Sequence, residues 1–228
     1  ALQVYEQAGL KRELIEALSN LGSLHVLLGD AASAEKQFRR AIEQAEKIGH
    51  PRGVTANLLA LGDLEWRRKR YEEAGALFHD GFARAREAED RNLMAESLLR
   101  AALNDRDRGR FEEGVKSAQQ ALEIAQATGA RLVEAEAFYA LGELARAQAK
   151  LEEALRYYAG GEAIAQAVGE PELGWRLAYG RGQALERLDR AEEAVAAYKQ
   201  AVTIIEEVRS QLREERFRAG YIEDKYQV

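Results

Sequence analysis

The chain is built on an internal repeat of 40 residues that keeps its spacing through five copies. Glycine or alanine recurs at this interval at three places in the repeat, and a ring or its substitute recurs at a fourth. The four series are Gly22, Gly62, Ala102, Gly142, Gly182; Ala34, Ala74, Gly114, Ala154, Ala194; Ala41, Gly81, Ala121, Gly161, Ala201; and Phe38, Phe78, Ala118, Tyr158, Tyr198. Such a period predicts a solenoid, in which each unit buries its apolar face only against its neighbours.

Composition favours helix throughout and narrows the classes of function. Proline occurs only twice in 228 residues, and the strong helix formers Ala, Leu, Glu and Arg are abundant. A net charge of −6 argues against a nucleic-acid binder, which needs a basic face. No apolar run is long enough to span a membrane, and the absence of cysteine excludes disulfides and thiolate sites. We therefore expect an all-α protein with no cofactor, no nucleic-acid partner and no membrane partner. The absence of cysteine fits any compartment, so a cytoplasmic location is the default expectation.

Each repeat should contain two helices joined by a tight turn. In the first repeat, apolar residues at three- and four-residue steps predict helices over about residues 11–28 and 32–48. Gly49 stands where a left-handed residue ends a helix, and Pro51 stands where proline can begin the next one. Glu89 replaces the glycine after the second repeat, so we expect a less sharply made turn there.

The repeat divides the chain into seven segments. They are 1–10, the tail of a preceding repeat whose start is missing; the five repeats 11–50, 51–90, 91–130, 131–170 and 171–210; and 211–228, a C-terminal capping or linker helix. Leu2, Val4 and Tyr5 would then lack a partner helix. We expect a monomer, with end-to-end association possible through this truncated repeat.

The small residues have an expected packing role. We expect Gly22 on the first helix to meet Ala34 on the second, where the two helices cross. In the third repeat the pair is inverted, Ala102 with Gly114, so the summed side-chain volume is kept. The third repeat is also the weakest copy because Ala118 replaces a ring, and we expect local opening to be easiest there.

The repeat pattern resembles the tetratricopeptide repeat. The first copy follows its motif at Leu18, Leu21, Gly22, His25, Ala34, Phe38 and Ala41, and later copies at Leu58, Leu61, Gly62, Ala74, Phe78 and at Phe138, Leu141, Gly142, Ala154, Tyr158. The match covers residues 11–209, and its spacing is similar to a longer-helix subclass found in bacterial signalling proteins and eukaryotic scaffolds. The resemblance implies a right-handed α-solenoid of about five helix pairs plus a C-terminal capping helix. It also implies a non-catalytic scaffold that binds a protein or peptide in a concave groove lined by the first helices.

The C-terminal segment carries a second resemblance. Residues 208–228, with Val208-Arg209-Ser210-Gln211-Leu212 followed by an acidic and basic stretch and Tyr221-Ile222-Glu223-Asp224-Lys225, are similar to the junction between tetratricopeptide repeats and a CHAT domain. CHAT domains are caspase-like peptidase domains of bacterial proteins. A simpler interpretation is a polar capping helix whose inner face carries Leu212, Phe217, Tyr221, Ile222 and Tyr226.

Register within the resemblance assigns candidate residues to the groove. The candidates for partner binding are Asn20, Asp63, Trp66, Arg67, Leu99, Arg100, Arg106, Tyr139, Glu143, Arg146, Tyr179 and Gln183, and Arg176 and Arg187 take further groove places in the fifth repeat. Tyr139 and Tyr179 share a register, so we expect their rings to lie side by side. Tyr, Trp and Arg dominate binding hot spots.

The charged and aromatic candidates each have a plainer interpretation. Arg100, Arg106 and Arg146 could hold a carboxylate of a partner, although nearby glutamates offer internal ion pairs instead. Trp66 could be an aromatic anchor beside a basic rim, or a ring packed on the adjacent helix. The three histidines lack metal-ligand spacing, and no phosphate loop or nucleophile motif is present.

The leading hypothesis is therefore a protein-interaction scaffold, the recruiting or sensing arm of a larger bacterial protein with a CHAT-type peptidase domain. A second hypothesis is the ligand- or peptide-sensing arm of a bacterial transcriptional regulator. A third is a stand-alone adaptor or self-assembly module.

Overall fold

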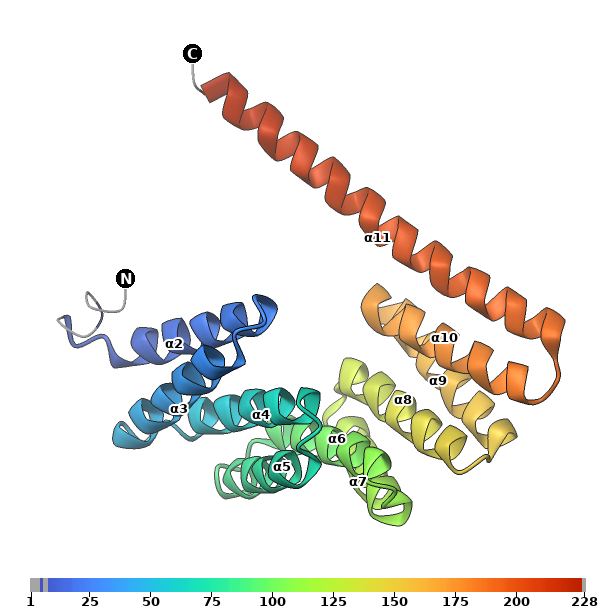
Figure 1. The fold of residues 1–228 in the computed structure, drawn as a ribbon, viewed down its shortest axis with the longest axis horizontal. Helices are drawn as coiled ribbons and strands as arrows, with labels where there is room; N and C mark the ends of the chain where they lie inside the picture. The colour runs from blue at the N-terminus through green and yellow to red at the C-terminus, as the bar shows by residue number, and fades with distance from the viewer. Residues whose placement is uncertain (1–4, 6–7, 227–228) are drawn as a thin grey trace. The chain divides into compact units, whose positions relative to one another are not determined.

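The computed structural model describes the backbone of residues 5 and 8–226, and side chains as far as Leu212. Leu2 and Val4, and the side chains of Phe217, Tyr221, Ile222 and Tyr226, lie outside the described residues. Over the described backbone the chain forms helices joined by short turns, with no strand (Figure 1). The prediction of an all-α repeat solenoid is confirmed.

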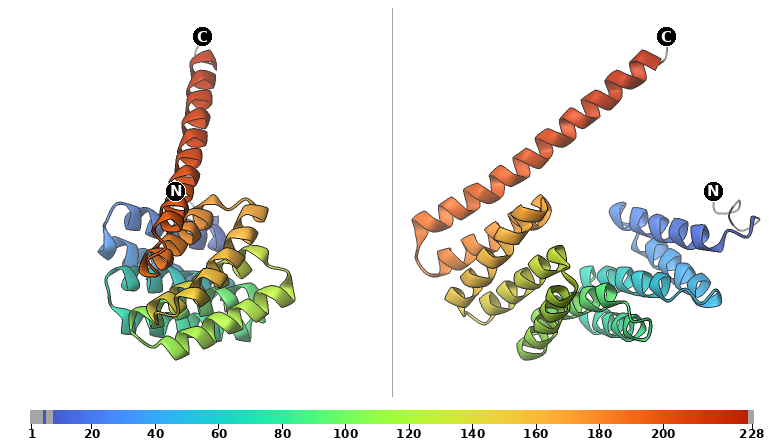
Figure 2. Two further views of the ribbon diagram at one scale, coloured as in Figure 1. Left: turned by 90° about the vertical axis from the view of Figure 1, so that its right-hand side faces the viewer. Right: turned by 180° about the vertical axis from the view of Figure 1, so that it is seen from behind.

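The helices alternate between first and second helices of successive hairpins (Figures 1 and 2). The first helices are α2 (Lys11–Leu27), α4 (Pro51–Arg67), α6 (Arg91–Asp107), α8 (Arg131–Ala147) and α10 (Pro171–Arg187). The second helices are α3 (Ala31–Lys47), α5 (Tyr71–Glu87), α7 (Phe111–Thr128), α9 (Leu151–Val168) and α11 (Ala191–Tyr226). Helix starts therefore recur every 40 residues in both series, and α4 and α10 begin with proline as expected.

The chain divides into two compact units. The N-terminal unit comprises Ala1–Val133, with helices α2 to α7 and the start of α8, and the C-terminal unit comprises Glu134–Val228, with the rest of α8 and helices α9 to α11. In each unit the core lies between consecutive helices and consists largely of alanine and leucine, with the rings of Phe38, Phe78 and Tyr158 in three of the hairpins.

The turns share one backbone geometry whether or not glycine is present. Between hairpins, Gly49 and Gly129 have φ values of 61° and 69°, and Glu89 adopts 54° at the equivalent place. In the turn within a hairpin, Ala149 adopts 60°. The expectation of a less sharply made turn at Glu89 is wrong. The Asp90 N–H donates to the Ala85 carbonyl at 2.9 Å, the same distance that closes the turn at Gly49. Hydrogen bonding in the turn holds Glu89 in the left-handed region despite its Cβ.

We predict that Glu89→Gly stabilises the N-terminal unit. The left-handed conformation costs a residue with a Cβ about 1–2 kcal/mol, and the greater freedom of glycine in the unfolded chain offsets part of the gain. The expected net effect is about 0.5–1 kcal/mol, measured by urea unfolding. Gly129→Ala, at an equivalent turn, is the matched control and should destabilise the chain. A loss of stability in Glu89→Gly would show that the turn is not strained.

The small residue of each first helix faces the ring of its own second helix. A Cβ placed on Gly22 would lie 2.5 Å from Cε1 of Phe38, and one on Gly62 would lie 2.5 Å from Cε1 of Phe78. Gly142 and Gly182 meet Tyr158 and Tyr198 in the same way, at 2.6 and 2.5 Å. These contacts are closer than a real Cβ tolerates, so the ring requires glycine opposite it.

This geometry adds a contact that the sequence analysis did not expect, because the side-chain atoms nearest to Gly22 are those of the Phe38 ring. The pairing of Gly22 with Ala34, and that of Ala102 with Gly114, stay predictions. In the third repeat Ala118 takes the place of the ring and Ala102 that of the glycine, and both are fully buried.

We predict strong coupling between glycine and ring. Gly62→Ala should cost about 1–3 kcal/mol, because the added methyl group overpacks the contact with Phe78. In a Phe78→Ala background the same change should cost nothing, since alanine favours helix over glycine by about 0.5–1 kcal/mol. Urea unfolding of the four chains of this double-mutant cycle measures the coupling. Equal costs of Gly62→Ala in both backgrounds would contradict the pairing.

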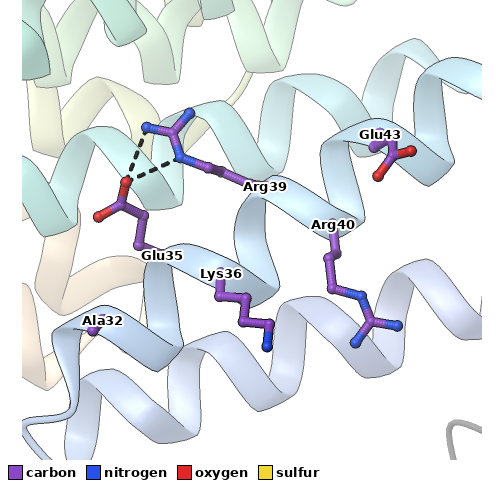
Figure 3. Close-up of a pocket in the computed structure, with 6 residues that line it drawn as sticks. All are labelled: Ala32, Glu35, Lys36, Arg39, Arg40 and Glu43. Carbon is purple, nitrogen blue, oxygen red and sulfur yellow. Dashed lines mark hydrogen bonds and ion pairs between the residues drawn. The ribbon is translucent and has the colours of Figure 1, made fainter.

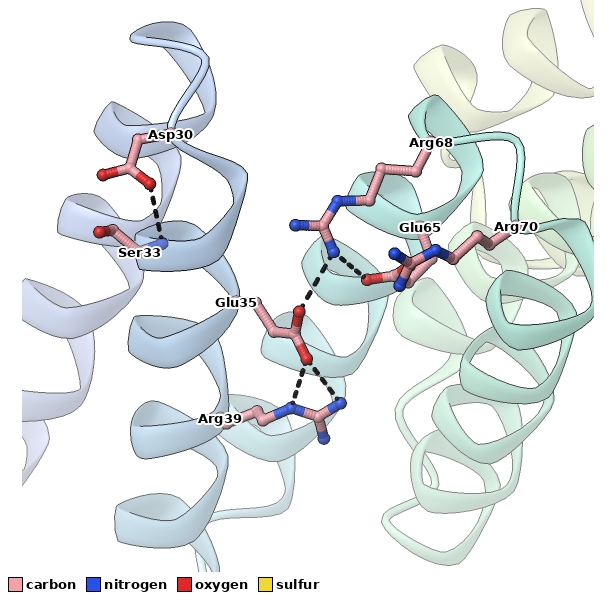
Figure 4. A network of polar contacts seen from close by, with 7 residues as sticks. All are labelled: Asp30, Ser33, Glu35, Arg39, Glu65, Arg68 and Arg70. Atoms are coloured by element: carbon pink, nitrogen blue, oxygen red, sulfur yellow. Dashed lines mark hydrogen bonds and ion pairs between the residues drawn. The ribbon is translucent and has the colours of Figure 1, made fainter.

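Charged residues at the helix ends connect neighbouring hairpins. Arg68 at the end of α4 donates to Glu35 on α3 at 3.1 Å and to Glu65 at 2.9 Å, and Arg70 in the following turn also binds Glu65 (Figure 4). Glu65 is buried, so its two arginine partners offset the cost of removing its charge from water. The network holds the turn after α4 against the preceding second helix.

The outer face of α3 is polar and solvated. A shallow hollow there is lined by Ala32, Glu35, Lys36, Arg39, Arg40 and Glu43, with Arg39 paired to Glu35 (Figure 3). Exposed pairs one helical turn apart contribute only about 0.3–0.5 kcal/mol each. This surface is a solvated helix face rather than a site.

The last second helix is twice as long as the others. α11 runs as one helix from Ala191 to Tyr226, so the expectation that it extends through Leu212 is confirmed, and residues 211–226 continue it rather than begin a separate capping helix (Figure 1). The residues from Glu206 to Arg218 contain no glycine or proline to end a helix. Residues 211–226 therefore continue α11 where the period would place the next first helix.

Candidate partner-binding surfaces on the first helices

The equivalent positions of the predicted groove do not all face solvent. Leu59 and Leu99, one period apart, are buried, with exposures of 2% and 6%. Leu59 packs in a cluster with Phe78 and with Leu93 of the next first helix, α6. Leu99 is therefore a core residue, and its assignment to a partner-binding surface is wrong. The same register holds the exposed Tyr179 in the fifth repeat, so register alone does not decide exposure.

In the N-terminal unit, Arg100 is held between carboxylates. Its Nε donates to Oδ2 of Asp63 at 3.1 Å, and its Nη1 lies 3.5 Å from Oε2 of Glu96. Burial raises the pKa of Asp63, and the charges of Arg100 and Arg67 oppose that rise. Asp63 and Arg100 thus form an interhelical pair between α4 and α6. Arg100 thus forms an ion pair within the chain, which the sequence analysis gave as the alternative to binding a partner's carboxylate.

Trp66 is packed on the adjacent helix. Its indole Nε1 donates to Oδ2 of Asp107 on α6 at 2.8 Å, and the ring lies against a buried cluster. Arg106 pairs with the other oxygen of the same carboxylate at 2.7 Å. Arg67 and, on α2, Asn20 are exposed. Of these four candidates, only Arg67 and Asn20 present most of their side chain to solvent.

In the C-terminal unit, Glu143, Arg146 and Tyr158 form a buried polar network. Glu143 and Arg146 were predicted to bind a partner, whereas Tyr158 was not. Tyr158 donates its hydroxyl to Oε1 of Glu143 at 2.7 Å, and Arg146 binds Oε2 of Glu143 at 2.6 Å and the Tyr158 oxygen at 3.2 Å. Burial, followed by the Glu143 charge, raises the pKa of Tyr158. Hydrogen bonding to Glu143 and its charge outweigh burial and raise the pKa of Arg146. Glu143 and Arg146 therefore lie beneath the predicted binding surface, and they are not the side chains that would contact a partner.

The two tyrosines of one register have different neighbours. The Arg176 guanidinium lies over the Tyr139 ring, with 4.4 Å from Cζ to the ring centroid. Tyr179 instead packs on Tyr198 of α11, with ring centroids 5.6 Å apart. The structure thus gives Tyr139 and Tyr179 separate partners rather than a shared stack. Tyr179 is 47% exposed, and Gln183, one turn on, is half-buried.

Sequence reasoning missed the polar role of Tyr158, which was placed only as a core ring. A signal was available, since a tyrosine in place of phenylalanine in a buried position needs a partner for its hydroxyl. Glu143 lies 15 residues before it, and Tyr198 shows a similar arrangement by donating to Glu186 at 2.7 Å.

Neither a metal site nor a membrane-spanning helix is found among the residues that the structure describes. No group of three or more His, Asp or Glu side chains there could hold a metal ion. Within the same part of the chain, no helix has both the length and the apolar character needed to cross a membrane.

The comparison with protein families decides what kind of repeat this is. The tetratricopeptide repeat family matches residues 19–91 and 132–209, which together are more than half of the chain. The chain belongs to the tetratricopeptide repeat family. The matched ranges leave out 92–131, the third repeat, where Ala102 and Ala118 depart from the glycine and ring of the other copies. No curated protein sequence matches the chain.

Solved structures show the same tetratricopeptide fold at low identity. BtubC (BKLC) from P. vanneervenii is 20% identical, with a TM-score of 0.75 over 91% of this chain and 86% of that one. A Rap protein complexed with competence and sporulation factor is 15% identical, with a TM-score of 0.77 over 92% of this chain and 62% of that one. The Rap conjugation gene regulator of plasmid pLS20, in complex with the Phr* peptide, is 15% identical, with a TM-score of 0.72 over 84% of this chain and 53% of that one.

We predict that the hydroxyl of Tyr158 stabilises the C-terminal unit. Tyr158→Phe leaves the buried Glu143 with one donor fewer, so it should cost about 1.5–3 kcal/mol. Tyr198→Phe is the matched control, because Tyr198 donates to the exposed Glu186 and its loss should stay within about 0.5 kcal/mol. Thermal and urea unfolding of both variants measure the difference. Equal effects would mean that the buried network contributes no more than a surface hydrogen bond.

Proposed function

We propose that this tetratricopeptide repeat chain is a scaffold that binds an extended, acidic peptide segment, and that α8 and α10 of the C-terminal unit carry the binding surface. One observation carries the proposal. Arg176 and Arg187 lie on one face of α10, and among the described side chains neither has a carboxylate within ion-pair distance. Arg100, Arg106 and Arg146, by contrast, are all paired with acidic residues of the chain.

Both arginines are held in place without being neutralised. The Arg176 guanidinium lies over the face of the Tyr139 ring, which positions it without cancelling its charge. Arg187 donates from Nη1 to the Arg146 carbonyl at 2.7 Å. A guanidinium fixed before binding loses less freedom when it binds a carboxylate, and it can bind both oxygens.

The spacing of the two arginines limits the ligand. They are 11 residues apart on one helix, which corresponds to about 16 Å at a rise of 1.5 Å per residue. An extended peptide covers that distance in about five residues. The proposed ligand therefore carries acidic side chains about five residues apart, with Gln183 between the two arginines available to bind the peptide backbone.

Selection from a phage-displayed library of random 16-residue peptides tests this function. We expect the selected pool to be enriched in pairs of Asp or Glu at this spacing. Arg176→Glu and Arg187→Glu should each weaken binding of a selected peptide at least tenfold in fluorescence anisotropy. Arg156→Glu is the matched control, because Arg156 is an exposed arginine on the second helix α9, and it should leave affinity within about twofold.

Two outcomes would contradict the proposal. Selected peptides that bind equally well to both charge-reversed variants would place the binding surface elsewhere. Binding that does not weaken between low and high salt would exclude a charged contact as its basis.

The role of this scaffold in a larger protein is a separate part of the proposal. The Rap relative bound to the Phr* peptide supports a peptide-sensing arm of a regulator. The similarity of residues 208–228 to a CHAT junction supports a recruiting arm of a peptidase, in a bacterial and cytoplasmic protein. The reading frame after Val228 distinguishes the two, since only the peptidase requires a domain with a His and Cys pair.

A further inference from the structure

The N-terminal unit contains two junctions at which one hairpin packs on the next. At the first junction α4 packs on α3, and at the second junction α6 packs on α5. Because the repeat keeps its spacing, each residue of α4 has an equivalent on α6 that lies 40 positions later. The two junctions can therefore be compared side chain by side chain.

The α5–α6 junction has the smaller apolar contact. Leu61 and Leu64 of α4 are buried in one cluster with Phe38 of α3. Their equivalents on α6 are Ala101 and Asn104. A methyl group and an amide thus replace two leucine side chains, and less apolar surface is removed from water at this junction.

Asn104 is buried without complete hydrogen bonding. It is 1% exposed, and its Nδ2 donates to the Tyr71 carbonyl at 3.0 Å. Among the described residues, no group donates a hydrogen bond to its Oδ1. The same place holds Leu64 in α4 and Leu144 in α8. A buried acceptor without a donor destabilises the packing around it, so the asparagine weakens this junction.

Asp105 is a second buried group that its neighbours compensate only in part. Glu65, its equivalent on α4, lies 2.9 and 3.1 Å from its two arginine partners (Figure 4). Asp105 is one methylene shorter, and it lies 3.5 Å from Arg108 and 3.4 Å from Arg110. Burial raises the pKa of Asp105, and the charges of Arg110, Arg108 and His79 offset only part of that rise.

The second helix of this junction also lacks the acidic residue found at the first. Glu35 of α3 accepts from Arg68 at 3.1 Å, and the equivalent of Glu35 on α5 is Gly75. Arg108 pairs instead with Glu72, whose side chain is 78% exposed. Because exposed ion pairs contribute little to stability, the network that closes the first junction is not replaced at the second.

We propose that the α5–α6 junction is the point at which the N-terminal unit opens, while the α3–α4 junction stays closed. Opening also separates α6 from α4, since α4 contacts α6 through Trp66 and Asp63. The Trp66 indole then loses its hydrogen bond to Asp107 and becomes exposed. The junction thus controls when this aromatic side chain is available to a partner, through the population of the open state.

Cysteine labelling measures the opening of each junction. The natural chain contains no cysteine, so one introduced thiol reports on one place. Ala45 on α3 and Ala85 on α5 are equivalent and fully buried, and they lie in the apolar clusters of the first and second junction. In native buffer we expect iodoacetamide to react with the thiol of Ala85→Cys at least tenfold faster than with that of Ala45→Cys.

Two further substitutions test the cause of the opening. Asn104→Leu restores the leucine of the equivalent places, and Asp105→Glu lengthens the side chain so that it reaches its arginines. Each should reduce the ratio of the two labelling rates at least fivefold. Asn92→Leu is the matched control, because Asn92 is an exposed asparagine of α6, and it should leave the ratio within twofold.

Two results would overturn the proposal. They are equal labelling rates for the two thiols, and a ratio that neither Asn104→Leu nor Asp105→Glu reduces. Urea unfolding of each variant establishes that it is folded, and either substitution is sufficient if the other destabilises the chain. Arg176 and Arg187 of the proposed peptide surface lie in the C-terminal unit and are unchanged, so the two proposals fail independently.

Discussion

The packing of a ring against a glycine sets the geometry of every hairpin in which it occurs. Because a Cβ on Gly62 would lie 2.5 Å from the Phe78 ring, the two helices can approach only where the first has no side chain. That closeness fixes which face of each second helix points to the next hairpin. In the third repeat Ala102 and Ala118 occupy the places of the glycine and the ring, and both are fully buried.

Most of the fold could be predicted from the sequence, because period and turn signals act locally. The helix starts, the prolines of α4 and α10 and the glycine turns follow from single positions. The contact between Gly22 and the Phe38 ring could not be predicted, since several positions share the period and only packing decides which ones meet. The left-handed conformation of Glu89 could not be predicted either, because the hydrogen bonds of the turn hold a conformation that glutamate alone disfavours.

The candidate site was less predictable than the fold. Register identifies the helix and the approximate face, but a shift of one position separates a solvent-facing residue from a core residue such as Leu99. It is harder still to predict which arginines form ion pairs. First helices carry Arg100, Arg146 and Arg176, which differ in whether a carboxylate reaches the guanidinium. That difference depends on contacts across hairpins, which spacing along the chain does not specify.

The uniform turn geometry has a consequence for how such a chain can change in length. Gly49, Lys69, Ala149 and Asp189 all adopt the same left-handed conformation, so the turn geometry is kept even where a residue with a Cβ replaces glycine. Each hairpin also presents similar faces to its two neighbours. Duplication or deletion of one 40-residue block therefore preserves every type of contact, whereas an insertion of any other length disrupts them. The gene can gain or lose binding surface in whole hairpins, and the third repeat shows how one copy can diverge while its neighbours keep the pattern.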